Sequence, residues 1–165
     1  MRVNLTILFC LFAYAGYVNA ADDIVQEVRH EVLLVPGYTV FDWIEYQVEG
    51  GKVRLLGDVT RADVKRDVEN AVKHIKGVTT VQNDIEVLPA SATDDRIRQD
   101  LIQAIDKSMS VYMSEEIRRI HVIVKNGNVT LNGEVSSQSD KDHAFALAKH
   151  EQNVREVTNN LAVQK

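Results

Sequence analysis

The chain has 165 residues, of which 26% are charged and 45% hydrophobic, and its formal net charge at pH 7 is −5. Residues 21–90 carry 8 basic and 13 acidic side chains, and residues 91–165 carry 10 basic and 11 acidic ones. Because a nucleic-acid partner requires a basic footprint, this balance excludes nucleic-acid binding. It also argues against a broad electrostatic attraction to anionic lipid.

The first 20 residues have the pattern of a secretory signal peptide. A positive start at Arg2 is followed by an apolar run from Leu5 to Tyr17, and Val18 and Ala20 occupy the −3 and −1 positions of a cleavage site. The alternative, a membrane anchor, would need about 20 apolar residues, which is more than this run contains. We therefore predict cleavage after Ala20.

The only cysteine of the chain, Cys10, lies inside this apolar run. A lipid-modified cysteine follows a small residue and ends the run, whereas Phe9 precedes Cys10 and the run continues, so we do not expect a lipoprotein. The mature chain would contain no cysteine and therefore no disulfide. A cysteine-free exported protein fits a bacterial periplasm better than eukaryotic secretion, and we predict the periplasm.

A helix and a β-hairpin are predicted next along the chain. Ile24, Val28 and Val32 recur at a spacing of four, which is typical of one apolar stripe on a helix. Residues 44–48 then alternate between apolar and polar, which indicates a half-buried strand. Gly50-Gly51 supplies the positive φ angles of a hairpin turn.

A second strand, a second helix and a third strand complete this unit. The alternation continues through residues 53–59, and apolar residues then recur at helical spacing over 64–75. Thr60 is predicted to cap the helix and Gly77 to end it. Residues 78–87 have the pattern of a third strand.

The same α-β-β-α-β order is then repeated. The sequence GGKVRLLGDV at 50–59 returns as NGNVTLNGEV at 126–135, an offset of 76 positions. The apolar stripe of the first helix returns as Ile97, Leu101 and Ile105, at an offset of 73, because the second copy has extra residues before its first strand. The second helix of this copy is predicted to begin at a serine, Ser136 or Ser139.

The predicted architecture is therefore α+β, with two tandem α-β-β-α-β units, each a three-stranded mixed sheet with two helices on one face. The first unit is assigned to residues 21–88, the linker to 89–93 and the second unit to 94–165. A unit of this size is small for burying a hydrophobic core of its own, so we expect the two units to pack against each other.

Four glycines in the two hairpins are predicted to be structural. Gly51 and Gly127 belong to the hairpin turns. Gly57 and Gly133 stand on the inward-facing register of the second strand, where a glycine permits the close approach of a helix or marks a bulge.

The duplicated motifs resemble those of double-BON proteins, the family named for bacterial OsmY and nodulation. The resemblance rests on the G-x-V-x-L-x-G-x-V strands (51–59 and 127–135) and the V-x-x-V-x-N-x-[IL]-x-V closing strands (78–87 and 154–163). It implies a periplasmic, non-enzymatic protein of the osmotic or envelope stress response. The domain is described as a phospholipid-binding module, and the family offers no catalytic residues.

Catalytic, cofactor and metal sites are not predicted. The mature chain has five histidines, of which His143 and His150 share one face of a predicted helix. Seven residues of helix separate them by about 10 Å along the axis, which is too far for one metal ion. We find no nucleophile–base pair, phosphate loop or metal-ligand spacing, and no small-molecule substrate is evident.

A lipid-facing surface is one hypothesis for the segment 108–119. A cluster of apolar side chains beside arginines, here called the lip, can lie at a lipid interface. Glu115 and Glu116 count against this interpretation. The alternative is that Met109 ends a buried helix stripe and Tyr112 caps the core. The candidate residues are Met109, Val111, Tyr112, Met113, Arg118 and Arg119.

A protein-binding patch is the second hypothesis. Four apolar side chains share the outward register of the first sheet and require a cover, which is either the second unit or a partner protein. Free sheet edges could also accept an extended peptide. The predicted partners are thus phospholipid surfaces or, alternatively, envelope proteins bound by a chaperone-like module. The patch consists of Phe41, Trp43, Leu56 and Leu88.

Overall fold

The computed structural model describes residues 20–112 and 119–164, with side chains from Asp23 onward. The predicted signal peptide therefore lies outside the described residues, except for Ala20, which begins the first helix. Met113 and Arg118 of the predicted lip also lie outside. No helix in the described part of the chain is both long and apolar enough to span a membrane.

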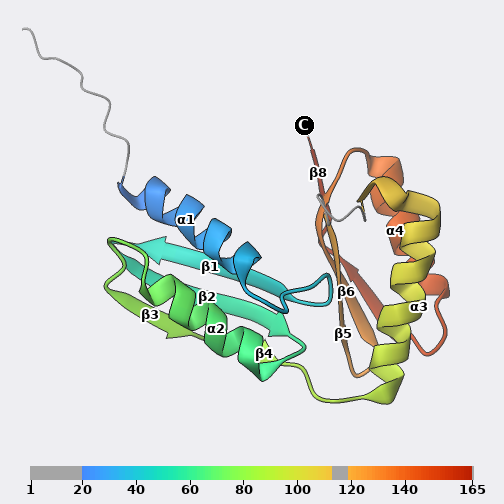
Figure 1. The fold of residues 1–165 in the computed structure, drawn as a ribbon. Coiled ribbons are helices and arrows are strands. Elements are labelled where there is room, and N and C mark those ends of the chain that lie inside the picture. Colours follow the sequence, from blue (N-terminus) through green and yellow to red (C-terminus); the bar gives the residue numbers. More distant parts are fainter. Residues whose placement is uncertain (1–19, 113–118, 165) are drawn as a thin grey trace, which may run out of the picture.

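The two units have the same order of elements, which confirms the predicted α+β class (Figure 1). The first unit contains α1 (Ala20–Leu34), β1 (Trp43–Glu49), β2 (Lys52–Val59), α2 (Ala62–Lys73), β3 (Thr80–Asn83) and β4 (Glu86–Val87). The second contains α3 (Ala92–Met109), the 3₁₀ turn η1 (Ser110–Tyr112), β5 (Ile120–Lys125), β6 (Asn128–Val135), α4 (Gln138–His150), β7 (Glu156–Asn159) and β8 (Ala162–Val163).

Each sheet is mixed and has its second strand in the middle. β2 pairs antiparallel with β1 on one side and parallel with β3 and β4 on the other. The predicted third strand is thus divided into two short strands on the same side of β2. The division occurs because the Asn83 side-chain oxygen accepts the Ile85 N–H at 3.2 Å, which turns the backbone locally.

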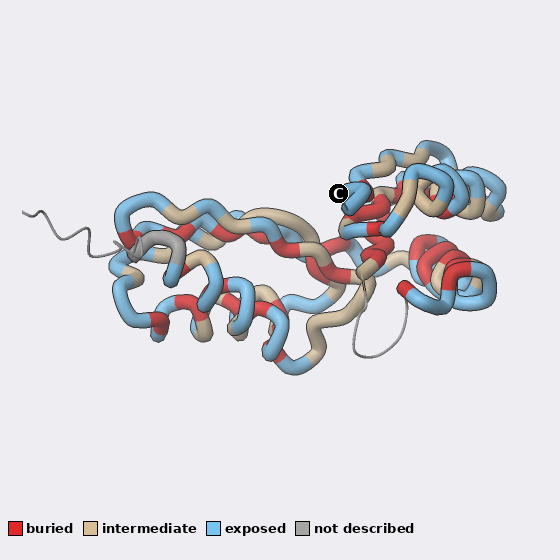
Figure 2. Tube along the Cα trace, turned by 90° about the horizontal axis from the view of Figure 1, so that it is seen from above, coloured by how far each residue is buried: buried red, intermediate tan, exposed pale blue. Residues whose placement is uncertain are grey.

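Two helices cover one face of each sheet, as predicted (Figure 1). Ile24, Val28 and Val32 of α1 are all buried, as are the corresponding residues of α3. Two separate hydrophobic cores result, one in each unit. Buried segments also continue through the region where the two units meet (Figure 2).

The helix starts differ from those predicted. Arg61 holds the N-cap position of α2 and makes no side-chain cap, because its guanidinium has no acceptor. The hydroxyl of Thr60, the predicted cap, donates to the Asp42 carboxylate instead. Ser137, between the two predicted serines, caps α4. Helix α3 begins at Ala92, inside the predicted linker, because the Ser91 hydroxyl accepts the Asp94 N–H.

The glycines in β2 and β6 are required for a different reason from the one predicted. Gly57 and Gly133 have φ angles of +111° and +119°. A Cβ atom at these positions would overlap the carbonyl oxygens of Trp43 and Arg119, respectively. The close approach is therefore made by the backbone of the neighbouring strand and not by a helix.

Substitution of Gly133 or Gly57 with alanine should destabilise the fold. We expect a loss of about 1–3 kcal/mol or more, because the new Cβ meets backbone and the φ angle is strained. Gly50→Ala is the matched control, since φ is +54° there and nothing lies within 4 Å of its Cβ. Urea unfolding measures all three, and equal midpoints for Gly133→Ala and Gly50→Ala would contradict this account.

Candidate functional site

The two units meet where the segment after α1 reaches the free edge of β5. The backbone N–H of Val122, on β5, donates to the carbonyl oxygen of Val40 at 2.7 Å. A turn of the first unit, closed by the hydrogen bond from the Asp42 N–H to the Thr39 carbonyl oxygen, therefore contacts the edge of the second sheet through one backbone hydrogen bond.

His121 is the central side chain of this junction. Its Nδ1 lies 2.6 Å from the Asp42 carbonyl oxygen, and because that oxygen can only accept, Nδ1 is the donor. The imidazole centroid lies 5.8 Å from the ring of Tyr38 and 5.1 Å from that of Trp43, with an edge-on geometry to the latter. His121 is only 8% exposed, so the junction is packed as well as hydrogen-bonded.

Asp42 fixes the position of the backbone that contacts His121. Its carboxylate is fully buried and accepts four hydrogen bonds. Thr39 donates its N–H and hydroxyl to Oδ2 at 2.8 and 2.9 Å. Thr60 donates the same pair of groups to Oδ1 at 2.6 and 2.9 Å. The carboxylate thereby ties the loop before β1 to the end of β2.

The outward face of β5 meets the first unit beyond His121. Lys125 Nζ lies 2.6–2.7 Å from the two Glu86 carboxylate oxygens, but this pair is largely exposed, so solvent screens it and its contribution to stability is small. Ile123 and Leu88 are buried, yet neither belongs to one of the two cores. Their burial outside both cores indicates that apolar packing also holds the junction.

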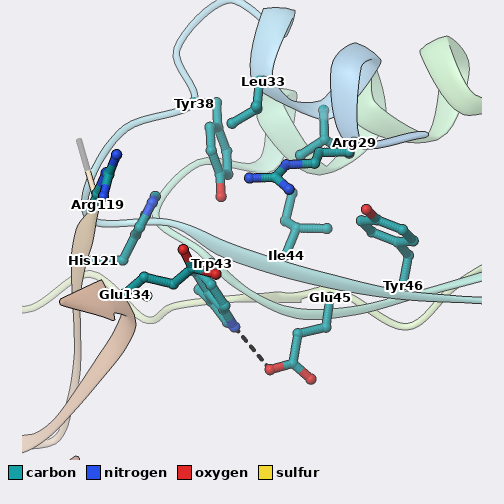
Figure 3. A pocket seen from close by; sticks show the side chains of 12 residues that line it. Arg29, Leu33, Tyr38, Trp43, Ile44, Glu45, Tyr46, Arg119, His121 and Glu134 are labelled. Carbon is teal, nitrogen blue, oxygen red and sulfur yellow. Dashed lines mark hydrogen bonds between the residues drawn. The ribbon is translucent and has the colours of Figure 1, made fainter. Parts of the chain in front are cut away.

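An open groove of about 690 Å³ lies beside the junction, between α1 and β1 (Figure 3). Helix α1 forms one wall, β1 forms another, and residues of the second unit close one end. The lining is therefore both apolar and charged. It comprises Arg29, Val32, Leu33, Tyr38, Trp43, Ile44, Glu45, Tyr46, Arg119, His121, Gly133 and Glu134.

Most of the charged side chains in the groove already have polar partners. Gln164 accepts from Arg119 at 3.1 Å and donates to Glu134 at 2.9 Å. Glu45 accepts from the Trp43 indole at 2.9 Å. Within the described part of the chain, the Arg29 guanidinium makes no hydrogen bond or ion pair. Arg29 is thus the cation of the groove that is available to a ligand.

Burial shifts the pKa of two groups at the junction. It raises the pKa of the Tyr38 hydroxyl, and the nearby Asp42 charge adds to this rise. Burial also lowers the pKa of His121 from 6.5, although the hydrogen bond to Asp42 opposes the shift. His121 is accordingly neutral near pH 7.

The residues of the predicted lip do not all lie on the surface. Met109 and Tyr112 are each 5% exposed and belong to the second core, which agrees with the alternative interpretation of these two residues. The Tyr112 hydroxyl donates to Asp140 at 2.9 Å. Val111 is 65% exposed, and Arg119 lines the groove. A lipid-facing role for the remaining residues stays a prediction.

The predicted patch is divided between the junction and the surface. Trp43 contacts His121 of the second unit, and Leu88 is 5% exposed. Phe41 and Leu56 are half-buried. The docking role of this patch stays a prediction. Sequence reasoning missed Asp42 and His121, and the only local signal was a charged residue between the aromatic residues at 41 and 43.

Metal-ligating side chains do not gather in residues 20–112 and 119–164, where no group of three histidine, cysteine, aspartate or glutamate residues could hold an ion. His121 contacts Asp42 and Trp43 of the first unit and so helps to position the two units.

Comparisons with known proteins agree with the duplicated architecture. The model of the BON domain family matches residues 20–89 and 93–165. No curated protein matches the chain significantly. Among solved structures, a C-terminal domain of CdsD, described as the structural protein of the type III secretion system of Chlamydia trachomatis, is 12% identical, with 87% of this chain and 98% of that chain covered and a TM-score of 0.31.

A second structure of CdsD, from the same organism, is also 12% identical, and the match covers 86% of this chain and 92% of that chain with a TM-score of 0.31. Similarities this low carry no inference about fold or function.

The stability of the protein should depend on pH through His121. Because its folded-state pKa lies below 6.5, the contribution is complete above pH 6.5 and is lost as the pH falls through the folded-state pKa. Urea unfolding of the parent and of His121→Gln, between about pH 8 and about pH 5, measures this. The stability difference between them should shrink at low pH, and parallel curves would contradict the assignment.

Proposed function

The chain belongs to the BON domain family, and on that premise we propose that it is a non-enzymatic binding protein of the bacterial periplasm that attaches to phospholipid surfaces. The domain is thought to bind phospholipids, and BON proteins are generally non-enzymatic and typically periplasmic. The proposal includes a role in supporting the cell envelope under osmotic stress.

The observation that carries the lipid proposal is the composition of the groove and its rim. Arg29 and Arg119 both line the groove. Leu33 and Leu34, at the end of α1, are 58% and 61% exposed. A guanidinium group suits a phosphate, and exposed leucines suit the boundary between headgroups and acyl chains.

The strength of such an attachment is limited. A basic residue near an anionic membrane contributes about 1 kcal/mol, so two arginines contribute about 2 kcal/mol. The net charge of −5 opposes any longer-range attraction. We therefore expect reversible binding that weakens with salt and not permanent anchoring.

Co-sedimentation with vesicles tests this proposal. The protein lacking residues 1–20 should pellet with vesicles that contain phosphatidylglycerol and much less with pure phosphatidylcholine vesicles. Arg29→Gln should lower the affinity about fivefold, because it removes about 1 kcal/mol of attraction.

Arg96→Gln is the matched control for this experiment. It makes the same charge change at an exposed position of α3, away from the groove, and should bind like the parent. Equal pelleting with neutral and anionic vesicles, or identical affinities for the two variants, would contradict a groove-centred lipid site.

A chaperone-like or protein-interaction module is the second candidate, and a different observation favours it. Within the described residues, β1 pairs only with β2, so one side of this strand is a free edge. Suppression of the aggregation of an unfolded client, without binding to vesicles, would support this candidate over the first.

A further inference from the structure

The backbone groups on the free edge of β1 can be identified from the hairpin. Glu49 pairs with Lys52 across the two-residue turn Gly50-Gly51. In such a hairpin, the two residues that flank the turn exchange both of their backbone hydrogen bonds with each other. Every second residue along the strand exchanges bonds in the same way with its partner on the other strand. Glu49, Gln47 and Glu45 therefore bond to β2. The N–H and C=O groups of Ile44, Tyr46 and Val48 point away from β2.

The second unit confirms this geometry, because the equivalent edge of β5 is occupied. The N–H of Val122 donates to Val40 at 2.7 Å. The carbonyl oxygen of Val124 accepts from Arg98 Nη2 at 2.5 Å. Arg98 is only 4% exposed, so the second contact is buried within the fold. Val122 and Val124 are both residues whose backbone groups point away from β6 when the same alternation is counted from the turn of this hairpin.

The first unit has no counterpart of either of these two contacts at the edge of β1. At the repeat offset of 76, Tyr46 and Val48 correspond to Val122 and Val124. At the helix offset of 73, Val25 corresponds to Arg98, and valine has no side-chain donor. The Ile44 backbone lies near the Tyr38 hydroxyl, where it lowers the pKa of that group. Within the described residues, the outward groups of Tyr46 and Val48 have no such partner.

We propose that this open edge binds an extended segment of another polypeptide, which adds to β1 as a strand at Tyr46 and Val48. The inference goes beyond lipid attachment and concerns a protein partner. Backbone hydrogen bonds would supply affinity, and the groove would select the side chains of the segment.

The contact between the two units shows that the equivalent edge of β5 accepts a backbone group from another segment. The turn at residues 39–42 gives the carbonyl of Val40 to Val122 and places the neighbouring Trp43 against His121. The groove beside β1 is continuous with this junction, since Trp43 and His121 line its end.

The chemistry of the groove specifies the partner further. Leu33 and Tyr46 offer apolar surface next to the edge, which suits alternate apolar side chains. Arg29, which has no polar partner within the described residues, suits a carboxylate. The predicted ligand is therefore an extended segment with alternating apolar residues and an acidic group.

Amide hydrogen exchange, followed by NMR on the protein lacking residues 1–20, tests the proposal. The probe is a soluble peptide of alternating valine and threonine residues that ends in aspartate. Without the peptide, the amides of Tyr46 and Val48 should exchange fast, whereas those of Glu45 and Gln47, bonded to β2, should exchange slowly. Saturating peptide should slow Tyr46 and Val48 about tenfold or more and leave the other two unchanged.

Two controls separate strand addition from side-chain binding. A probe with proline in place of its central valine lacks a backbone donor and should bind more weakly. Arg29→Glu should weaken binding of the acidic probe, whereas Arg96→Glu on α3 should not. Both substitutions are at exposed positions, so neither should prevent folding.

Three results would overturn the proposal. The first is unchanged exchange of Tyr46 and Val48 at saturating peptide. The second is protection that rises with protein concentration alone, which would assign the edge to a second copy of this chain. The third is protection caused by anionic vesicles and not by the peptide, which would assign the edge to the lipid site. Vesicle co-sedimentation is measured independently, so failure of the lipid proposal is distinguishable from failure of this one.

Discussion

The burial of one carboxylate, that of Asp42, is the constraint on which the junction of the two units depends. A fully buried charge is tolerated only when hydrogen bonds replace its hydration, and the four donors come from Thr39 and Thr60. These bonds hold the loop before β1 in one conformation. The same loop presents its carbonyl groups to Val122 and His121, so the order of the loop and the contact between the units have a common cause.

The duplication gives two units with the same fold but different edges. In the second unit, Arg98 caps β5, and Asp94 accepts the N–H groups of Asn126 and Gly127 at 2.8 Å each, which ties α3 to the hairpin. At the offset of 73 that relates the first helices, Val25 and Ala21 correspond to these residues, and neither has a polar side chain. The second unit is therefore closed by its own side chains and by the first unit, whereas the first unit keeps an available strand edge.

Regular elements were predictable from the sequence because their signals are local. The spacing of Ile24, Val28 and Val32 depends only on helix geometry, and the alternation along β1 depends only on the pleat of a strand. Both patterns recur in the second copy, which strengthens each assignment. The class of the fold and the mixed sheets follow from these local periods.

The site could not be predicted in the same way, because it depends on contacts between distant residues. Thr60 has the side chain of a helix cap, but its hydroxyl is taken by Asp42, 18 residues away. His121 reaches a carbonyl 79 residues away. An apolar stretch such as 109–112 has the same local pattern at a surface as in a core. Only the position of α4, whose Asp140 accepts from the Tyr112 hydroxyl, decides that Tyr112 is buried.

The lipid site and the strand site proposed for the first unit share one cation, Arg29. Arg29 lines the groove beside β1 together with the exposed Leu33, and its guanidinium would pair with either a phosphate or a carboxylate. A single guanidinium in one groove does not serve a headgroup and an acidic strand fully at the same time. The two ligands are thus competitors by geometry, and attachment to a membrane would lower the affinity of the same unit for an extended polypeptide.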